Sequence, residues 1–333
     1  MKVSLDDIRR AHSRIAPHIR KTPLMEATIV AKPPTPARLW LKLENLQVTG
    51  SFKARGATSK LLTLPPAELA AGVVTASGGN HGLATARAAN MAKVPATIYV
   101  PENVASYKVD KLRAMGAKVI VTGSIWNETN QFATAFAEET GAACFHPFAD
   151  PAVVAGQGSL ALEILEERPG LTAVLIAIGG GGLITGMAIA LKALKPSIRI
   201  IGVEPVGCPT FHASIGAGHV VPVEKVTTRV ATMACAETDP EVFTLSRNLI
   251  DDVVLIEDED MVSAARYLWS EFGLAADLSG AAAIGGAARS RGAARVRKKK
   301  VSVGRMAKRL SRSRRNTFVP PKSIFCSATR QRP

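Results

Sequence analysis

Short apolar runs alternate along the chain with longer stretches in which apolar residues recur at helical spacing. Each run is short enough for a buried strand, and most contain Val or Ile. Because alternating strands and helices pack as parallel sheets with helices on both faces, this pattern predicts an α/β fold with open sheets. The predicted strands are residues 73–76, 96–100, 119–121, 173–178 and 198–203.

Two glycine-rich segments each follow a predicted strand and precede a helical pattern. Residues 77–82 read Ser-Gly-Gly-Asn-His-Gly, and residues 179–182 are four consecutive glycines. In this layout, main-chain N–H groups and the positive end of a helix dipole can meet an anion that glycine allows to approach closely. Either segment by itself is explained by a turn, but four glycines exceed what a turn requires. Neither has the dinucleotide pattern Gly-x-Gly-x-x-Gly or the Lys-Ser/Thr of a P-loop.

Lys53 lies in Thr-Gly-Ser-Phe-Lys-Ala-Arg-Gly-Ala, residues 49–57, at the predicted start of a helix. Most lysines decorate solvated helix faces, and this interpretation is favoured if Lys53 is considered in isolation. A lysine shielded from water instead loses its proton readily, and its free amine can attack a carbonyl carbon. Small residues and one aromatic residue flank Lys53, and both interpretations stay open at this point.

Four motifs occur together and in a fixed order along the chain. They are residues 51–57 (Ser-Phe-Lys-Ala-Arg-Gly-Ala), 77–82, 156–159 (Gly-Gln-Gly-Ser) and 179–182. Together they resemble the serine/threonine dehydratase and serine racemase group of fold-type-II pyridoxal-phosphate enzymes, and the resemblance extends over residues 5–290. It implies the tryptophan-synthase-β-like fold type II, with two open twisted sheets flanked by helices.

The resemblance implies a role for each matching residue. Lys53 would hold pyridoxal 5′-phosphate through its amine, Phe52 would pack beside the pyridine ring, and Asn80 would hydrogen-bond the 3′-oxygen. The cofactor is the electron sink in such enzymes, while the protein supplies orientation and proton transfer. The cofactor phosphate would be bound by Gly179, Gly180, Gly181 and Gly182, and the substrate carboxylate by the loop that contains Ser77, Asn80 and His81.

The resemblance also implies how the chain is organised. A larger cofactor-binding domain would comprise residues 1–71 and 149–300, and a smaller domain would comprise residues 72–148. Residues 301–333 would form a basic tail that departs from the family pattern. A cytoplasmic homodimer acting on a small amino-acid substrate is expected. No Pro- or Gly-rich linker marks the domain boundaries.

The chain departs from the family at several positions that carry chemistry. Racemases of the group have a serine directly before the Gly-Asn of the Asn80 loop, whereas this chain has Gly78, which cannot transfer a proton. Members that bind a divalent cation have Glu followed six residues later by Asp. Here Glu204 is followed by Thr210, so we expect no metal site. The usual Glu-Pro-Ser-Gly-Ala segment begins with Asp277, to which we therefore assign no role.

Composition is consistent with an enzyme. The chain has 333 residues, 47% of them apolar, which is ample for two domains. No apolar stretch approaches the ~20 residues of a membrane span, and the acidic N-terminus does not resemble a secretory signal. Four scattered cysteines indicate reduced thiols, as in the cytoplasm. The histidines form no ligand cluster, and Glu163, Glu166 and Glu167 have the spacing of a solvated helix face.

The C-terminal segment differs in charge from the rest of the chain. The whole chain has 42 Lys+Arg and 27 Asp+Glu, and residues 287–333 hold 16 of the basic residues and no acidic residue. This segment could be an arm that contacts nucleic acid non-specifically, a solvated tail, or a sequence foreign to the fold. We favour the last interpretation, because the family strand that should begin at Val301 stops at Gly304. A change of reading frame near codon 303 would produce this pattern.

The residues and the resemblance together predict β-elimination by a lyase of amino-acid metabolism. The Lys53 amine would remove the Cα proton as general base, and the cofactor phosphate would assist departure of the β-hydroxyl. L-threonine or L-serine would then give a 2-oxo acid and ammonia. Alternatives are serine racemase, β-replacement and 3-hydroxyaspartate dehydratase. An alternative of another class is an inactive cofactor-binding protein or a tail-driven nucleic-acid-binding protein. Because the strand at Val301 and its pyridine-nitrogen contact would be missing, weak cofactor binding and poor turnover are also expected.

Overall fold

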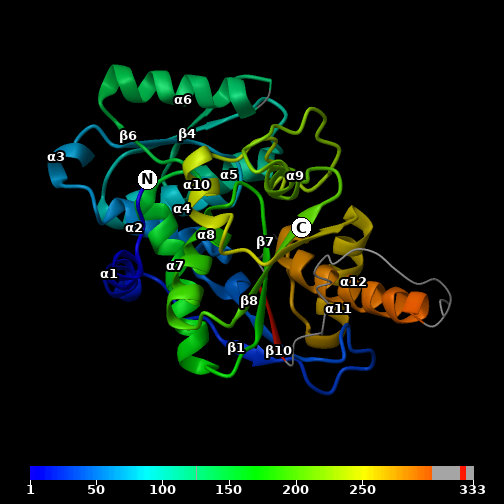
Figure 1. Ribbon diagram of the computed structural model, residues 1–333. Coiled ribbons are helices and arrows are strands. Elements are labelled where there is room, and N and C mark those ends of the chain that lie inside the picture. Colours follow the sequence, from blue (N-terminus) through cyan, green and yellow to red (C-terminus); the bar gives the residue numbers. More distant parts are fainter. Residues whose placement is uncertain (125, 302–322, 328–333) are drawn as a thin grey trace.

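The framework of the protein consists of two sheets. The computed structural model describes residues 1–124, 126–301 and 323–327 (Figure 1). The larger sheet has six strands in the order β1-β2-β10-β7-β8-β9. β1 is antiparallel to β2, and all other neighbours are parallel. Its strands are β1 (Leu24–Glu26), β2 (Arg38–Lys42), β7 (Ala173–Ala177), β8 (Arg199–Pro205), β9 (Asp252–Ile256) and β10 (Ser323–Ser327).

The smaller sheet comes from one continuous stretch of the chain. Its order is β5-β4-β3-β6, and all neighbours are parallel. Its strands are β3 (Val73–Ala76), β4 (Ala96–Val100), β5 (Lys118–Val121) and β6 (Ala143–Cys144). The strands predicted from the apolar runs correspond to β3, β4, β5, β7 and β8, so the predicted α/β class is confirmed.

Helices cover the faces of both sheets, as open parallel sheets require. Ser4, Asp150 and Asp239 cap the helices that follow them with side-chain oxygens, which satisfies main-chain N–H groups at those helix starts. The helices are α1 (Leu5–Ile15), α2 (Lys53–Leu61), α3 (Pro66–Leu69), α4 (Asn80–Ala92), α5 (Ser106–Ala114), α6 (Trp126–Thr140), α7 (Pro151–Glu167), α8 (Gly182–Leu194), α9 (Thr210–Ala217), α10 (Pro240–Ser246), α11 (Asp258–Phe272) and α12 (Leu278–Val301).

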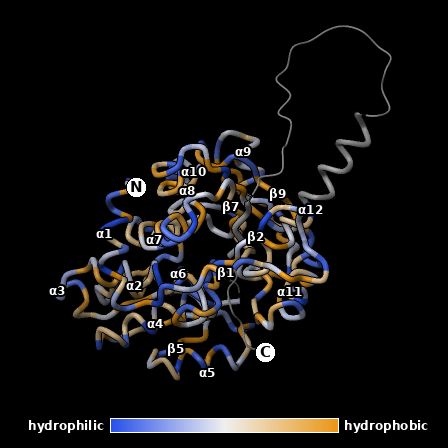
Figure 2. Tube along the Cα trace, turned by 90° about the horizontal axis from the view of Figure 1, so that it is seen from below, coloured by the Kyte–Doolittle hydropathy of each residue, from blue (hydrophilic) through white to orange (hydrophobic). Residues whose placement is uncertain are grey.

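Alternating residues of β7 face the two helical layers of the larger sheet. Val174 and Ile176 belong to a core that includes residues of α1, α7 and α8. Leu175 belongs to a second core formed with α11 and α12. Side chains of a strand point to opposite faces in turn, so a continuously apolar strand can serve both cores. Figures 1 and 2 show α7 and α8 on one side of the sheet and α11 and α12 on the other.

The smaller sheet follows the same rule. Val73 and Ile98 pack into a core with residues of α2, α4 and α5. Val74 and Tyr99 belong to a core on the opposite face, where α6 lies. α2 therefore takes part in the core of the smaller sheet. It also packs closely on α7, which covers the larger sheet. We call the part of the molecule built around each sheet the larger half and the smaller half. This position between the halves places the start of α2 where both sheets can contribute residues.

Glycines allow α2 and α7 to approach closely. A Cβ on Gly156 would lie 2.7 Å from the main-chain oxygen of Arg55, and one on Gly56 would lie 2.4 Å from Nε2 of Gln157. A Cβ on Gly158 would lie 2.8 Å from the main-chain oxygen of Gly186 in α8. The Gly-Gln-Gly-Ser motif at residues 156–159 therefore serves helix packing behind the start of α2.

The C-terminal part of the chain differs from our expectation. Helix α12 continues through Val301, so the prediction of a strand beginning at Val301 is wrong. Residues 287–300 are rich in Ala, Arg and Lys, which favour a helix. The place between β2 and β7 is taken by β10, where Ile324 pairs with Leu39 on one side and Ala173 on the other. The larger sheet is therefore continuous across its centre.

Parts of the predicted organisation are not tested by these elements. Residues 302–322 and 328–333 of the predicted tail lie outside the described residues, as does the expected contact to the pyridine nitrogen. The strands of the smaller sheet lie within residues 72–148, but the domain boundaries themselves stay a prediction. No helix in the described ranges is long and apolar enough to cross a bilayer.

Candidate active site

Lys53 is the first residue of α2. Its Nζ donates a hydrogen bond of 2.8 Å to the main-chain oxygen of Pro147 and lies 5.5 Å from the centre of the Phe52 ring. Burial lowers the pKa of the Lys53 amine to about 8, while the neighbouring Cys235 thiol acts in the opposite direction. An amine with this pKa is partly unprotonated near neutral pH, so it can act as a nucleophile or a base.

The four glycines join the end of β7 to the first turn of α8. Gly181 has a φ of +92°, in the left-handed region that favours glycine. A Cβ on Gly180 would lie 2.2 Å from the Phe148 ring, and one on Gly179 would lie 2.9 Å from the main-chain oxygen of Thr232. No side chain caps α8, and the N–H groups of residues 179–182 have no hydrogen-bond partner within the described part of the chain. These N–H groups can therefore bind an anion.

The second glycine segment joins β3 to α4, which begins at Asn80 with no capping side chain. The N–H of Gly79 donates to Oγ of Ser77 at 3.3 Å. A Cβ on Gly82 would lie 1.9 Å from the main-chain oxygen of Ser77, whereas one on Gly79 would meet nothing within 4 Å. Gly82 therefore allows the chain to pack closely against the main-chain oxygen of Ser77. The first N–H groups of α4 follow this loop and have no partner within the helix.

The segment between β6 and α7 contacts three of the four predicted motifs, those at residues 51–57, 77–82 and 179–182. The main-chain oxygen of Phe145 lies 2.9 Å from Nε2 of His81, and that of Pro147 accepts the hydrogen bond from Lys53. The ring of Phe148 lies against the glycine segment that follows β7. The structure thus brings Lys53, the Asn80 loop and the four glycines to one site at the carboxyl ends of strands from both sheets.

His81 is neutral in this site. It is 3% exposed, and because a carbonyl oxygen only accepts hydrogen bonds, the contact with Phe145 requires the proton to be on Nε2. Burial and the positive charge of Lys53 lower the pKa of His81 to about 3. Nδ1 has no hydrogen-bond partner among the described residues. The His81 side chain therefore offers no positive charge to a carboxylate, and its main-chain N–H is the group suited to an anion.

The loop between α9 and α10 supplies residues that the sequence motifs do not reveal. Oγ1 of Thr238 donates to the main-chain oxygen of Gly180 at 3.1 Å. Burial raises the pKa of the Cys235 thiol to about 11, and the thiol donates to the main-chain oxygen of Glu237 at 3.1 Å. Cys235 is thus a neutral thiol beside the Lys53 amine. The loop has no regular secondary structure, and no spacing in the sequence points to it.

Asp277 reaches the Asn80 loop from the opposite half of the molecule. Its Oδ2 accepts a hydrogen bond of 3.1 Å from Nδ2 of Asn80, and the residue is 6% exposed. Asp277 directly precedes α12, and Oδ1 accepts from the N–H of Gly280 at 2.6 Å. The sequence analysis assigned no role to Asp277. The geometry shows that it contacts a residue expected to bind the cofactor.

A buried network of charges anchors α2 behind Lys53. Arg55 donates two hydrogen bonds of 2.8 Å to Glu44 and bonds of 2.7 and 3.0 Å to Glu163. Nζ of Lys42 lies 2.6 Å from Oε2 of Glu163, and all four residues are 2% exposed or less. The prediction that Glu163 lies on a solvated face is wrong, because its partners come from α2 and β2. The two positive and two negative charges neutralise one another, and this pairing offsets the free-energy cost of burying them.

Glu204 caps a helix. Its carboxylate accepts hydrogen bonds from the N–H groups of Phe211 at 2.8 Å and His212 at 2.9 Å, in the first turn of α9. Burial raises the pKa of Glu204 to about 7, although these two hydrogen bonds act in the opposite direction. Within the described ranges, no group of three or more His, Cys, Asp or Glu residues could hold a metal ion. Glu204 thus lies near the end of β8, and its carboxylate caps the start of α9.

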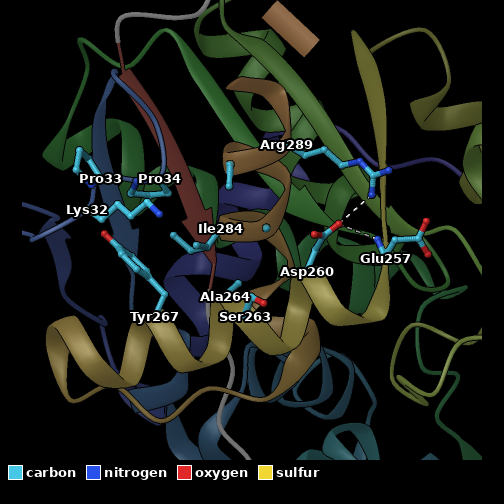
Figure 3. A pocket seen from close by; sticks show the side chains of 12 residues that line it. Lys32, Pro33, Pro34, Glu257, Asp260, Ser263, Ala264, Tyr267, Ile284 and Arg289 are labelled. Atoms are coloured by element: carbon cyan, nitrogen blue, oxygen red, sulfur yellow. Dashed lines mark hydrogen bonds and ion pairs between the residues drawn. The ribbon is translucent and has the colours of Figure 1, made fainter. Parts of the chain in front are cut away.

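A separate cavity of about 650 Å³ lies between α11, α12 and the loop at residues 32–34 (Figure 3). Asp260 and Arg289 form an ion pair of 2.9 Å at its edge. Its lining includes no residue of the Lys53 site. The cavity therefore belongs to the packing of α11 and α12 and not to the site described above.

Comparison with known proteins identifies the family. Residues 15–304 match the family described as "Pyridoxal-phosphate dependent enzyme". The chain belongs to this family. The match begins within α1 and ends just after α12, so it includes Lys53, both glycine segments and Asp277. The resemblance and the fold type predicted from the sequence motifs are therefore confirmed.

Several members of the pyridoxal-phosphate dependent family are similar to this chain over most of its length. L-threonine ammonia-lyase of Thermotoga maritima is 37% identical over 279 residues, which is 84% of this chain and 69% of the relative. Serine racemase of Oryza sativa subsp. indica is 36% identical over 281 residues, covering 83% of this chain and 81% of the relative. The structure of maize serine racemase has a TM-score of 0.87 and 29% identity, and the alignment covers 100% of this chain and 95% of that one.

The described residues fit pyridoxal phosphate, the cofactor of the family. The glycine segment offers unpartnered N–H groups, and its close contacts with Phe148 and Thr232 exclude side chains that would fill the space for a phosphate. Lys53 offers an amine of lowered pKa for the aldehyde carbon, and Phe52 lies beside that amine. Asn80 can donate to an oxygen substituent of the ring. The donor set therefore matches an aldehyde that carries a phosphate.

Proposed function

We propose that this enzyme is a lyase that eliminates water from L-threonine or L-serine to give a 2-oxo acid and ammonia. The observation that carries the proposal is the position of the Lys53 amine, whose pKa is lowered by burial, in the same site as two anion-binding loops. The relatives include enzymes named L-threonine ammonia-lyase and L-threonine dehydratase. A deprotonated amine near a bound carboxylate suits removal of a proton from the adjacent carbon.

Each residue of the site has a separate role in the proposed reaction. Lys53 would hold the cofactor through Nζ, and its amine, once free, would accept the Cα proton of the substrate at the same atom. The N–H groups of residues 179–182 bind the phosphate, and Asn80 donates to the 3′-oxygen. When bound, pyridoxal phosphate supplies an electron sink for the carbanion left by proton removal. The pKa of about 8 at Lys53 suits a group that must both give and accept a proton near neutral pH.

The substrate carboxylate belongs at the start of α4. The N–H groups of Asn80 and His81 lie at a helix N-terminus, where an anion is stabilised by the helix dipole. Ser77 orders the loop by accepting from the N–H of Gly79. The neutral His81 side chain supplies no positive charge that could pair with a second carboxylate. 3-Hydroxyaspartate, which has two, is the less favoured alternative substrate.

Racemisation is the other activity named among the relatives, and Gly78 argues against it. Racemisation requires a proton donor on the face of the substrate opposite Lys53, and glycine has none. A Cβ on Gly78 would lie 2.7 Å from Cγ2 of Val104, so even a serine would need Val104 to move. These features favour elimination over racemisation.

The setting proposed for the enzyme is the cytoplasm, where reduced thiols persist. The three cysteines whose side chains are described, Cys144, Cys208 and Cys235, are free thiols. A homodimer with small amino-acid substrates is proposed from the family resemblance. The expectation of weak cofactor binding and poor turnover had two grounds, a missing strand and a missing contact to the pyridine nitrogen. β10 fills the place of the strand and so removes the first ground, whereas the contact lies outside the described residues. We therefore propose that the chain turns over its substrate.

Turnover of L-threonine in the presence of pyridoxal phosphate tests the proposed function. The full chain should form 2-oxobutanoate, and borohydride reduction should attach a pyridoxyl group to the peptide that contains Lys53. Lys53→Ala should lose activity by at least about a thousandfold, because nucleophile and base are removed together. Lys225→Ala, which changes an exposed lysine, is the matched control.

Each result has a clear meaning. Formation of D-serine from L-serine at a rate similar to elimination would favour the racemase instead. Product from 3-hydroxyaspartate but not from L-threonine would replace the proposed substrate. A chain that forms no product and carries no pyridoxyl group at Lys53 would contradict the proposal and support the inactive alternative.

A further inference from the structure

The two carboxylate oxygens of Asp277 face different partners. Oδ1 accepts from the N–H of Gly280 at 2.6 Å and from Oγ of Ser279 at 2.8 Å, so it caps the first turn of α12. Oδ2 points the other way and accepts from Nδ2 of Asn80 at 3.1 Å. Asp277 is 6% exposed and Asn80 is half-buried, so this contact is partly shielded from water. The capping bonds hold the carboxylate in place, and the second oxygen then has a fixed direction.

The contact determines which way the Asn80 amide faces. A carboxylate oxygen accepts hydrogen bonds and cannot donate one, so the NH₂ group and not the carbonyl oxygen of Asn80 must face Asp277. One N–H of that NH₂ group points to Oδ2, and the other is left for a second acceptor. Without such a partner, the two orientations of an asparagine amide are similar in shape and differ only in their hydrogen bonds.

We propose that Asp277 is a positioning residue that orients the Asn80 amide so that its second N–H is presented to the cofactor oxygen. The inference rests on the role proposed above for Asn80. Asp277 would also link the two halves of the molecule. Asn80 begins α4 of the smaller half, and Asp277 precedes α12 of the larger half. A hydrogen bond to a charged acceptor is stronger than one between neutral groups, which suits this purpose.

Three substitutions separate the capping role from the orienting role. Asp277→Ser and Asp277→Asn both keep an oxygen that can cap α12, because Ser, Asn and Asp are all effective N-caps. Asp277→Ser removes the acceptor for Asn80. Asp277→Asn replaces it by an NH₂ group, which faces the NH₂ of Asn80 and so favours the opposite orientation of the Asn80 amide. Asp277→Glu keeps the acceptor and is the conservative variant.

The first measurement uses the cofactor-free full chain and needs no turnover. Thermal unfolding is compared for the wild type, Asn80→Ala, Asp277→Ser and the double variant. If the contact exists, the two substitutions should be non-additive by on the order of 2 °C, because the double variant loses the same hydrogen bond only once. Additive shifts would show that Asp277 does not act on Asn80 and would overturn the inference.

The second measurement is the dissociation constant of pyridoxal phosphate, obtained by absorbance titration. Asp277→Asn should weaken binding by roughly tenfold and Asp277→Ser by less, since only the former opposes the required amide orientation. In an Asn80→Ala background the same substitutions should change binding by less than about twofold, because nothing is left to orient. Asp277→Glu should stay close to the wild type.

The outcomes distinguish this inference from the proposed function. If Asp277→Asn binds the cofactor as well as the wild type, or no worse than Asp277→Ser, the orienting role is wrong even when threonine is turned over. If the effects follow the stated order but no 2-oxobutanoate forms, the orienting role stands and the substrate is wrong. If the wild type does not bind the cofactor, the unfolding comparison decides the question.

Discussion

The larger and smaller halves of this enzyme hold their parts of the active site by different means. The larger half positions Lys53 on a helix fixed by the buried charges of Arg55, Glu44, Glu163 and Lys42. The smaller half offers a loop closed by main-chain contacts around Gly82 and linked to the other half through Asn80 and Asp277. The helix that carries Lys53, the proposed nucleophile and base, is thus anchored by buried ion pairs, whereas the loop proposed to bind the substrate is held by main-chain contacts and one side-chain hydrogen bond to the other half.

The difference extends to how each sheet is assembled. The smaller sheet uses strands from residues 73–144, each separated from the next by a helix. The larger sheet combines strands from both ends of the chain and has β10 at its centre. The smaller sheet therefore depends on local chain connectivity, and the larger sheet depends on segments that are far apart in sequence.

Removal of residues 302–333 should have the largest effect, and it should act on the larger half. The main-chain groups of β2 and β7 would lose the strand between them. We expect a loss comparable to the whole stability of a typical protein, roughly 5–15 kcal/mol, and hence no cooperative unfolding transition by circular dichroism. Deletion of residues 328–333, which keeps β10, is the control and should unfold as the full chain does. A cooperative transition at an unchanged temperature in the longer deletion would show that β10 is dispensable.

Loss of one buried charge should have an intermediate effect. Glu163→Gln leaves Arg55 and Lys42 buried without their shared carboxylate, which should cost about 3–5 kcal/mol in the free energy of urea unfolding. Glu166→Gln lies three residues further along the same helix and removes an exposed pair with Lys21, so its cost in the free energy of unfolding should be much smaller. Equal costs for the two variants would mean that the buried network does not anchor α2.

The smallest effect concerns protonation and leaves the fold unchanged. In the cofactor-free protein, acetylation of Lys53 should increase with pH around a midpoint of about 8, because only the deprotonated amine reacts. Exposed lysines, with an ordinary pKa of about 10.4, should react appreciably only at higher pH. Peptide mass spectrometry measures both in one sample. A Lys53 midpoint equal to that of exposed lysines would show that burial does not favour the free amine.

Local patterns predicted the fold well where a feature depends on nearby residues. The apolar runs that became β3, β4, β7 and β8 are continuous in sequence, and the glycine segments follow β3 and β7 directly. Strand period, glycine and helix spacing are all visible within one short window. The position of Lys53 at the start of a helix is a local feature of the same kind.

Features that depend on distant partners could not be predicted in this way. Glu163 shares a helix face with the exposed Glu166, and only its contact with Arg55, 108 residues away, explains its burial. Asp277 meets Asn80 across 197 residues. β10 follows a basic segment, and only the three central residues of this five-residue strand are apolar. In each case the interaction that decides the outcome lies outside any local window.

The central place of β10 also bears on the order in which the enzyme forms during synthesis. A ribosome completes residues 73–144 long before it reaches residues 323–327, so the smaller sheet can assemble while translation continues. The larger sheet has to wait, with the edges of β2 and β7 open to pairing with other chains. A nascent chain therefore carries Lys53 without its finished surroundings until residues 323–327 have been made, and protection of those edges by a chaperone would matter most in that interval.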